Sequence, residues 1–324
     1  MPKPIFIVGT GRSGTTLLRA ILNAHPDLHL SKESSFLVVA KEKKYNRSSK
    51  AALERYFQSI PFGWLRLDRN DVLSRIPENA SYVDSFRALL ETDAARYGKT
   101  AWGDKTPTHW MKINSIREKF PDAVIINLVR DPRDVVASLL KVPFGSPSFV
   151  MNSIYTELAL RHLRKQVDVH HLRLEDLLEN PEQILRFILK QIDLPWDDHL
   201  LQHDRYSVND VGGIPWLAKA YKPLQRKVSK RSLPQRQEAW VEWICRSAFV
   251  HFGYQKNKTR LSFKALISDL PPFFKSLIHV LKIYFFPCSD RDKEFERWHL
   301  HNLKAFDLYP EWDIGRIIEA TFEE

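Results

Sequence analysis

Short apolar runs alternate along the chain with segments whose apolar residues recur at helical spacing. The short runs have the alternating or β-branched pattern that is typical of strands. Strands are predicted at 5–8, 28–30, 123–129 and 169–174, and a further strand ends at 103–107. Helices are predicted at 17–22, over most of 36–100, and at 108–120, 135–141, 151–166, 181–191 and 234–253. This order of elements predicts an α/β fold with a doubly wound parallel sheet flanked by helices.

A glycine-rich turn joins the first predicted strand to the first predicted helix. The segment reads Gly9-Thr-Gly-Arg-Ser-Gly-Thr-Thr16. In such a turn the backbone N–H groups and the positive end of the helix dipole point at one spot, and phosphate is the usual ligand. We therefore expect a phosphate-bearing ligand at this turn. A connecting turn without a ligand is the alternative.

The residues of the turn narrow the class of phosphate compound. The loop pattern of nucleoside triphosphatases fits at Gly9 and Gly14, but Thr15 stands where that loop has its lysine. The glycines also fit the dinucleotide-binding pattern, which is weak evidence on its own. The turn instead offers the guanidinium of Arg12 and several hydroxyl groups, which suit an oxyanion held without a metal ion. The hydroxyl groups belong to Ser13, Thr15 and Thr16.

Four charged residues follow predicted strands at their carboxyl ends. They are Arg12, Glu33, Lys105 and Arg130. The carboxyl ends of parallel strands lie at one edge of a sheet, and ligands bind at that edge in this class of fold. We therefore group the four residues into one site.

Composition limits the partners and cofactors. The 324 residues carry a net charge of +10, which favours anionic ligands. No zinc-finger spacing or RNA-binding aromatic motif is present, so a nucleic-acid partner is not expected. Histidines, cysteines and carboxylates do not occur at metal-ligand spacing, so no metal is expected. Cys245 and Cys288 are expected to be free buried thiols.

The segments near the two ends of the chain bear on its location. The first predicted strand begins at Ile5 with no leader pattern before it, and no stretch of about 20 apolar residues is long enough to span a bilayer. We therefore expect a cytoplasmic protein. Residues 256–290 mix basic and apolar side chains, so they either make peripheral contact with an anionic membrane or form a helix packed on their own domain.

One internal segment is strongly basic. Seven Lys and Arg residues and no acidic residue lie between Val211 and Gln237. Two interpretations stay open: a solvated surface loop, or a loop that closes over a polyanionic cofactor.

Two motifs stand in order along the chain, Gly11-Arg-Ser-Gly-Thr-Thr16 and Val129-Arg-Asp-Pro-Arg-Asp-Val-Val-Ala-Ser138. They resemble the 5′-phosphosulfate loop and the 3′-phosphate motif of the sulfotransferase superfamily, whose members use 3′-phosphoadenosine 5′-phosphosulfate (PAPS). The flanking segments at 19–27 and 103–107 look most like the tyrosylprotein sulfotransferase branch and its bacterial relatives. The similarity runs from about Ile5 to Tyr254.

The resemblance implies a P-loop-like, PAPS-dependent sulfotransferase domain at 1–256. It does not cover residues 257–324, which are expected to form a helical C-terminal extension of unknown role. It implies that Glu33 is the general base, that Arg12 and Lys105 stabilise the leaving group, and that no metal is required. The residues implied to bind PAPS and its product PAP are Gly11, Arg12, Ser13, Gly14, Thr15, Thr16, Arg130, Ser138 and Lys222. One position departs from the pattern: Leu174 stands where relatives often have a tyrosine that contacts the nucleotide.

The implied acceptor carries a hydroxyl group. A glycan, a lipid-linked compound or a small-molecule alcohol is favoured over tyrosine, because no N-terminal anchor precedes the first strand. Two other functions stay open at this stage. One is a nucleoside triphosphate-dependent kinase with a degenerate loop, and the other is a non-catalytic protein that binds nucleotides or other anions.

Overall fold

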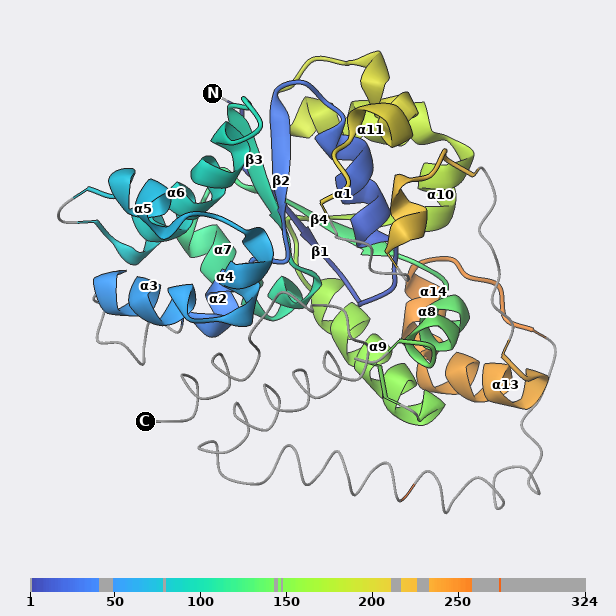
Figure 1. The fold of residues 1–324 in the computed structure, drawn as a ribbon. Helices are drawn as coiled ribbons and strands as arrows, with labels where there is room; N and C mark the ends of the chain where they lie inside the picture. The colour runs from blue at the N-terminus through green and yellow to red at the C-terminus, as the bar shows by residue number, and fades with distance from the viewer. Residues whose placement is uncertain are drawn as a thin grey trace. The chain divides into compact units, whose positions relative to one another are not determined.

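The computed structural model describes residues 2–40, 49–77, 80–142, 145–146, 148–210, 217–225, 233–257 and 274 (Figure 1). These residues form two compact units. The first unit holds the described residues of 2–129 and 166–225, and the second holds those of 130–165 and 233–257 together with Phe274. Apart from a few residues, the predicted extension at 257–324 and the predicted membrane-contact segment at 256–290 lie outside the described residues, as does Cys288. Those expectations stay predictions.

The first unit is built on a parallel sheet. Its strands are β1 (Ile5–Val8), β2 (Leu28–Lys32), β3 (Ala101–Lys105), β4 (Val124–Val129) and β5 (Val169–Arg173). They lie in the order β2-β3-β1-β4-β5, and every neighbouring pair is parallel. From β1 the chain goes to the edge strand β2, returns to β3 beside β1, and then continues to β4 and β5 on the other side of β1. This order confirms the predicted doubly wound α/β fold. The sequence had indicated only the carboxyl end of β3.

Helices and short 3₁₀ turns connect these strands. They are α1 (Thr15–Asn23), α2 (Phe36–Val39), α3 (Ser49–Phe57), α4 (Ile60–Leu65), α5 (Arg69–Ser74), α6 (Tyr82–Ala95), η1 (Pro107–Lys112), α7 (Ile113–Lys119), α10 (Leu174–Glu179), α11 (Pro181–Gln191), η2 (Asp198–Gln202), α12 (His203–Tyr206) and η3 (Ala218–Tyr221). In Figure 1, α1 and α11 lie on one side of the sheet and α6 and α7 on the other.

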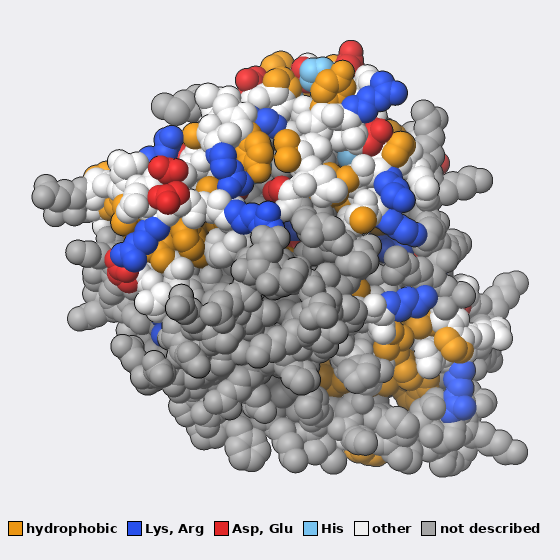
Figure 2. All heavy atoms as spheres, viewed as in Figure 1, with side chains coloured by type: hydrophobic (Ala, Val, Ile, Leu, Met, Phe, Trp, Pro, Cys, Tyr) orange, Lys and Arg blue, Asp and Glu red, His pale blue; other side chains and the backbone are white. Residues whose placement is uncertain are grey.

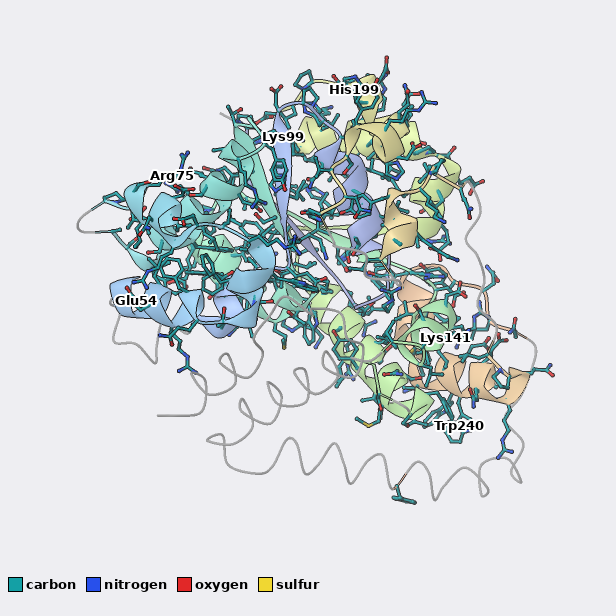
Figure 3. All side chains as sticks on the ribbon, in the orientation of Figure 1. Glu54, Arg75, Lys99, Lys141, His199 and Trp240 are labelled. Atoms are coloured by element: carbon teal, nitrogen blue, oxygen red, sulfur yellow. The ribbon has the colours of Figure 1, made fainter. Side chains whose placement is uncertain are left out.

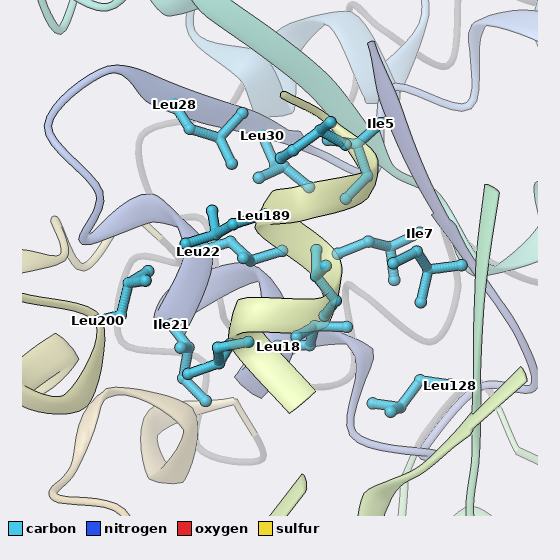
Figure 4. Packing of buried hydrophobic residues seen from close by; sticks show 14 of the residues in the cluster. Ile5, Ile7, Leu18, Ile21, Leu22, Leu28, Leu30, Leu128, Leu189 and Leu200 are labelled. Carbon is cyan, nitrogen blue, oxygen red and sulfur yellow. The ribbon is translucent and has the colours of Figure 1, made fainter. Parts of the chain in front are cut away.

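An aliphatic core lies between the sheet and two helices. Successive residues of a strand face opposite sides of a sheet. Ile5 and Ile7 of β1 therefore point the same way, and both join a buried cluster with Leu18 and Leu22 of α1 and Leu189 of α11 (Figure 4). This packing fixes α1, the helix after the glycine-rich turn, against the sheet.

An aromatic cluster covers the opposite face of β1. Phe6 lies 5.5 Å from the ring of Phe120 and 6.1 Å from that of Phe86 on α6. Phe86 in turn stacks on Phe36, the first residue of α2, at 4.7 Å. These contacts anchor α2, and with it the short loop between β2 and α2.

The second unit is helical in its described part. It contains α8 (Pro132–Leu139), α9 (Phe149–Leu163), α13 (Gln235–Ile244) and α14 (Arg246–His251). Trp240 of α13, labelled in Figure 3, is buried and contacts the edge of the Trp243 ring. The thiol of Cys245 is buried and forms no disulfide, as the sequence predicts for this cysteine. It donates to the carbonyl oxygen of Ser153 at 3.4 Å.

Several predicted helix boundaries differ from the structure. α8 begins at Pro132 rather than Val135, because Asp131 accepts a hydrogen bond from the Arg133 N–H and proline suits the first turn of a helix. The single helix predicted at 108–120 is a 3₁₀ turn followed by α7. The helix predicted at 234–253 divides at Cys245, where the backbone leaves helical geometry.

Charged side chains are spread over the surface. In Figure 2, lysine and arginine side chains lie at many points of the visible described face, with aspartate and glutamate between them.

In the part of the chain that the structure describes, no helix is both long enough and apolar enough to cross a membrane.

A buried ionic network ties α1 to the segment that follows α12. Arg19 of α1 is fully buried, donates to the carbonyl oxygen of Leu30 at 2.7 Å, and contacts both carboxylate oxygens of Asp210 at 2.9 and 2.5 Å. Tyr221 donates to Asp210 at 3.1 Å, and Lys32 donates to the Asp210 carbonyl oxygen. Burial opposes ionisation of Asp210, but the Arg19 guanidinium outweighs it and holds the pKa of that carboxyl well below its usual range.

The Arg19→Met variant tests this network. Removing one partner of a buried ion pair leaves the other charge uncompensated, so we expect unfolding free energy to fall by about 3–5 kcal/mol at neutral pH. The exposed pair of Lys3 and Asp193 offers a control, because Lys3→Met should change stability by less than about 1 kcal/mol. Urea denaturation measures both.

The pH dependence of that difference gives a second readout. Folding lowers the pKa of Asp210, so the ionised carboxylate stabilises the folded protein above its unfolded pKa of about 4. This stabilisation is lost as the pH falls below that value. The difference in unfolding free energy between the wild-type protein and Arg19→Met should therefore become smaller in acid. Equal losses of unfolding free energy in the Arg19 and Lys3 variants would contradict a stabilising role for the Arg19–Asp210 pair, as would a difference that does not change with pH.

Candidate active site

The glycine-rich turn is held in a shape that only glycine allows at two positions. Gly9 and Gly14 have φ angles of 149° and 100°, in the region that side chains rarely adopt. A Cβ atom on Gly14 would lie 2.8 Å from a methyl carbon of Leu174, and one on Gly9 would lie 2.9 Å from the Leu128 carbonyl oxygen. The turn thus lies tightly against the ends of the neighbouring elements.

The turn presents the start of α1 as a donor site. Gly14 precedes the helix and has no side chain to cap it, and the first N–H groups of any helix lack acceptors within the helix. The N–H groups of Thr15 and Thr16 belong to this first turn, and Arg12 lies just before them with a φ of 72°. A phosphate or sulfate group is the ligand that such a terminus binds well.

Ser13 stabilises the turn itself. Its side chain is fully buried, and both its hydroxyl and its N–H donate to the Thr10 carbonyl oxygen, at 2.9 and 3.3 Å. The donors of Ser13 therefore hold the loop together in this structure. Its predicted contact with the cofactor stays a prediction.

Three of the predicted site residues meet at the carboxyl edge of the sheet. Lys105, the last residue of β3, donates to Glu33 Oε1 at 2.5 Å and to Thr16 Oγ1 at 3.4 Å. The Lys105 side chain is 2% exposed, whereas that of Glu33 is 34% exposed. Burial lowers the pKa of Lys105, and the carboxylate of Glu33 partly offsets this shift. The grouping of Glu33 and Lys105 with the turn is therefore seen directly in the first unit.

The register of the sheet produces this meeting. Lys105 pairs with Lys32 of β2 and with Ile7 of β1, so the three strands end at nearly the same level. Glu33 follows β2 directly, and its N–H donates to the Lys105 carbonyl oxygen at 2.9 Å.

The remaining predicted site residues belong to other segments of the chain. Arg130 and Ser138 belong to the second unit, where Arg130 lies 3.8 Å from Asp134 and Ser138 is buried in α8. Lys222 is exposed and follows Tyr221, which the ionic network holds. The cofactor contacts expected of Arg130, Ser138 and Lys222 stay predictions.

Leu174 forms an apolar wall beside the turn. It is the first residue of α10, is 5% exposed, and lies against the position that a Gly14 side chain would occupy. At the position where relatives often have a tyrosine, this chain thus has a leucine that packs against the turn.

Within the described residues, no group of three or more His, Cys, Asp or Glu side chains is placed to hold a metal ion.

Sequence reasoning missed several polar residues that shape the site. Asp104 and His109 form a buried pair beside Lys105, and Arg19 and Asp210 form the pair described above. The position of Arg19 could have indicated a buried ion pair, because it is a charged residue inside the apolar run at 17–22. Nothing in the sequence identifies Asp210 as the partner, because the two residues are 191 positions apart.

Comparisons with known proteins place the chain in a family. The family model described as "Sulfotransferase family" matches residues 4–198. Protein-tyrosine sulfotransferase 1 from Danio rerio is 26% identical over 258 residues, and the protein-tyrosine sulfotransferase from Drosophila melanogaster is 28% identical over 257 residues. Each alignment covers 74% of this chain but only 65% and 46% of the two relatives.

Two solved structures share the fold. The sulfotransferase domain from the curacin biosynthetic pathway aligns over 79% of this chain and 99% of its own, with a TM-score of 0.51 and 22% identity. The sulfotransferase domain from the Synechococcus PCC 7002 olefin synthase aligns over 79% and 98%, with a TM-score of 0.53 and 20% identity. The match of the family model, together with the glycine-rich turn and the fold, shows that this chain belongs to the sulfotransferase family.

Proposed function

We propose that this protein transfers a sulfuryl group from PAPS to the hydroxyl group of an acceptor. The observation that carries the proposal is the buried Lys105 ammonium, which joins Glu33 to Thr16 at the mouth of the glycine-rich turn. PAPS supplies an activated sulfuryl group on its 5′-phosphate. The residues at the turn fit such a group, because they offer helix N–H groups, hydroxyls and cationic side chains, and their one carboxylate is paired with Lys105.

The turn and the start of α1 would hold the 5′ end of the cofactor. The N–H groups and hydroxyls of Thr15 and Thr16 would donate to phosphate oxygens, with the Arg12 guanidinium beside them. Lys105 donates to Thr16 at 3.4 Å, and in this proposal its ammonium would stabilise the negative charge that develops on the leaving phosphate. These groups need no metal ion for that role.

Glu33 would take the proton from the acceptor hydroxyl. Lys105 donates to Oε1, and the side chain is about one-third exposed, so an acceptor can reach the carboxylate from solvent. The hydrogen bond to Lys105 also restricts the carboxylate to one orientation.

Arg130 and Ser138 would bind the 3′-phosphate, which distinguishes PAPS from ATP and GTP. An arginine suits this role because its planar fork binds phosphate oxygens in pairs. Lys222 would add a further cation. Support for Arg130 and Ser138 comes from the motif at 129–138.

The acceptor is proposed by class. The sequence favours a glycan, a lipid-linked compound or a small-molecule alcohol over tyrosine. Because the relatives are named as protein-tyrosine sulfotransferases, a peptidyl tyrosine would be tested beside these acceptors.

The Glu33→Gln variant tests the base. Glutamine keeps the size of the side chain and an oxygen for Lys105 but does not accept the proton, so kcat should fall by about 10²–10⁴-fold with PAP affinity retained. Glu118→Gln, the same exchange on the exposed face of α7, should leave kcat unchanged. Transfer of radiolabelled sulfate from PAPS measures kcat. A Glu33→Gln enzyme with normal turnover would assign the base to another residue.

Arg130→Ala tests the 3′-phosphate contact. Loss of a charge-assisted hydrogen bond should weaken PAP binding by about 10–100-fold, while binding of 5′-AMP, which lacks the 3′-phosphate, should change little. Arg161→Ala removes an exposed arginine from α9 of the same unit and serves as the control. Calorimetric titration gives both affinities. Equal weakening of PAP and 5′-AMP would remove the proposed role.

A further inference from the structure

The backbone that carries Glu33 has an unusual conformation. Glu33 has a φ of 24° and Ser35 a φ of 49°, and neither is glycine. Non-glycine residues adopt this left-handed region only where the surrounding structure enforces it. The direction of the Glu33 side chain therefore depends on whatever holds the loop at 33–35.

Three successive N–H groups of this loop are held by three successive residues of β3 and its exit. The Glu33 N–H donates to the Lys105 carbonyl oxygen at 2.9 Å. The Ser34 N–H donates to Asp104 Oδ1 at 3.2 Å, and the Ser35 N–H donates to Thr106 Oγ1 at 3.1 Å. Side chains thus hold two of the three N–H groups.

Asp104 is itself fixed in place. Its side chain is fully buried, and its second oxygen, Oδ2, lies 3.0 Å from His109 Nδ1. His109 is also buried and meets the ring of Phe86 edge-on. Burial opposes ionisation of Asp104, but the close His109 ring and the hydrogen bond from the Ser34 N–H outweigh it and lower the pKa of the carboxyl.

Asp104 and Lys105 act on the loop from opposite faces of the sheet. Neighbouring strand residues point to opposite sides, and Asp104 pairs with Phe6 whereas Lys105 pairs with Ile7. The side chain of Lys105 therefore fixes the Glu33 carboxylate from the side of α1, while that of Asp104 fixes the backbone from the side of the aromatic cluster.

We propose that Asp104, oriented by His109, is a positioning residue that sets the direction of the Glu33 side chain through the Ser34 N–H, with Thr106 acting in the same way through Ser35. The proposal rests on the proposed function, because it assigns Glu33 as the base. Asp104 would touch neither cofactor nor acceptor, so its effect would pass entirely through Glu33.

A double-mutant cycle tests this proposal. Asp104→Ala removes the acceptor of the Ser34 N–H. Alone it should lower kcat by about 10–100-fold, as small displacements of a catalytic group do, with PAP affinity unchanged. In a Glu33→Gln background the same substitution should have no further effect, because the group it orients no longer accepts a proton. Thr106→Val should lower kcat in the same Glu33-dependent way and removes no buried charge, so it provides the test if Asp104→Ala does not fold.

Asp93→Ala is the matched control. Asp93 is also a buried aspartate beside a histidine: it is hydrogen-bonded to His29 at 3.1 Å, and it accepts from Ser31 at 2.6 Å. Its replacement should lower stability without a loss of kcat that depends on Glu33. An Asp104→Ala effect that multiplies with that of Glu33→Gln would overturn the proposal, as would an equal kcat loss in Asp93→Ala. A wild-type protein that binds PAP but transfers no sulfuryl group to any acceptor would overturn the proposed function, and the role of Asp104 with it.

Discussion

The site depends on one buried cation, the ammonium of Lys105. A charge removed from water must be paired, and in the first unit Lys105 is paired with Glu33 and hydrogen-bonded to Thr16. Because these residues follow β2, end β3 and begin α1, a single contact joins the three segments that build the site. In the proposed function, this contact brings together the carboxylate that would accept the proton and the cation that would stabilise negative charge.

A second buried cation, the guanidinium of Arg19, holds α1 beside the segment that precedes Lys222. Arg19 lies in α1, the helix that begins at the glycine-rich turn, and it is paired with Asp210 and hydrogen-bonded to Tyr221. The two ends of the 210–221 segment are thereby tied to the helix, and Lys222 follows directly. α1 is thus bonded at its first turn to β3 through Thr16, and at mid-length to a distant segment through Arg19. Packing of Leu18 and Leu22 on the sheet completes its placement.

Much of this could be predicted from the sequence, because the signals are local. The strands β1 and β4 appear as apolar runs, and the glycine turn appears as a short motif whose φ angles require glycine at Gly9 and Gly14. Placing Glu33 and Lys105 at strand ends sufficed to group them, since parallel strands end together. The Arg19–Asp210 pair and the bonds from Asp104 and Thr106 to the 33–35 loop could not be predicted, because they join residues that are 70 to 191 positions apart without a repeating pattern.

Calorimetric titration of the purified protein would show whether the site binds PAPS. PAP, 5′-AMP and ATP would each be titrated with and without Mg²⁺. We expect PAP to bind most tightly and 5′-AMP to bind more weakly, because it lacks the 3′-phosphate, and we expect Mg²⁺ to change neither affinity. A preference for ATP that requires Mg²⁺ would rule out PAPS as the cofactor and indicate a phosphoryl-transfer enzyme instead. Binding of none of the three would leave the fold without the proposed activity.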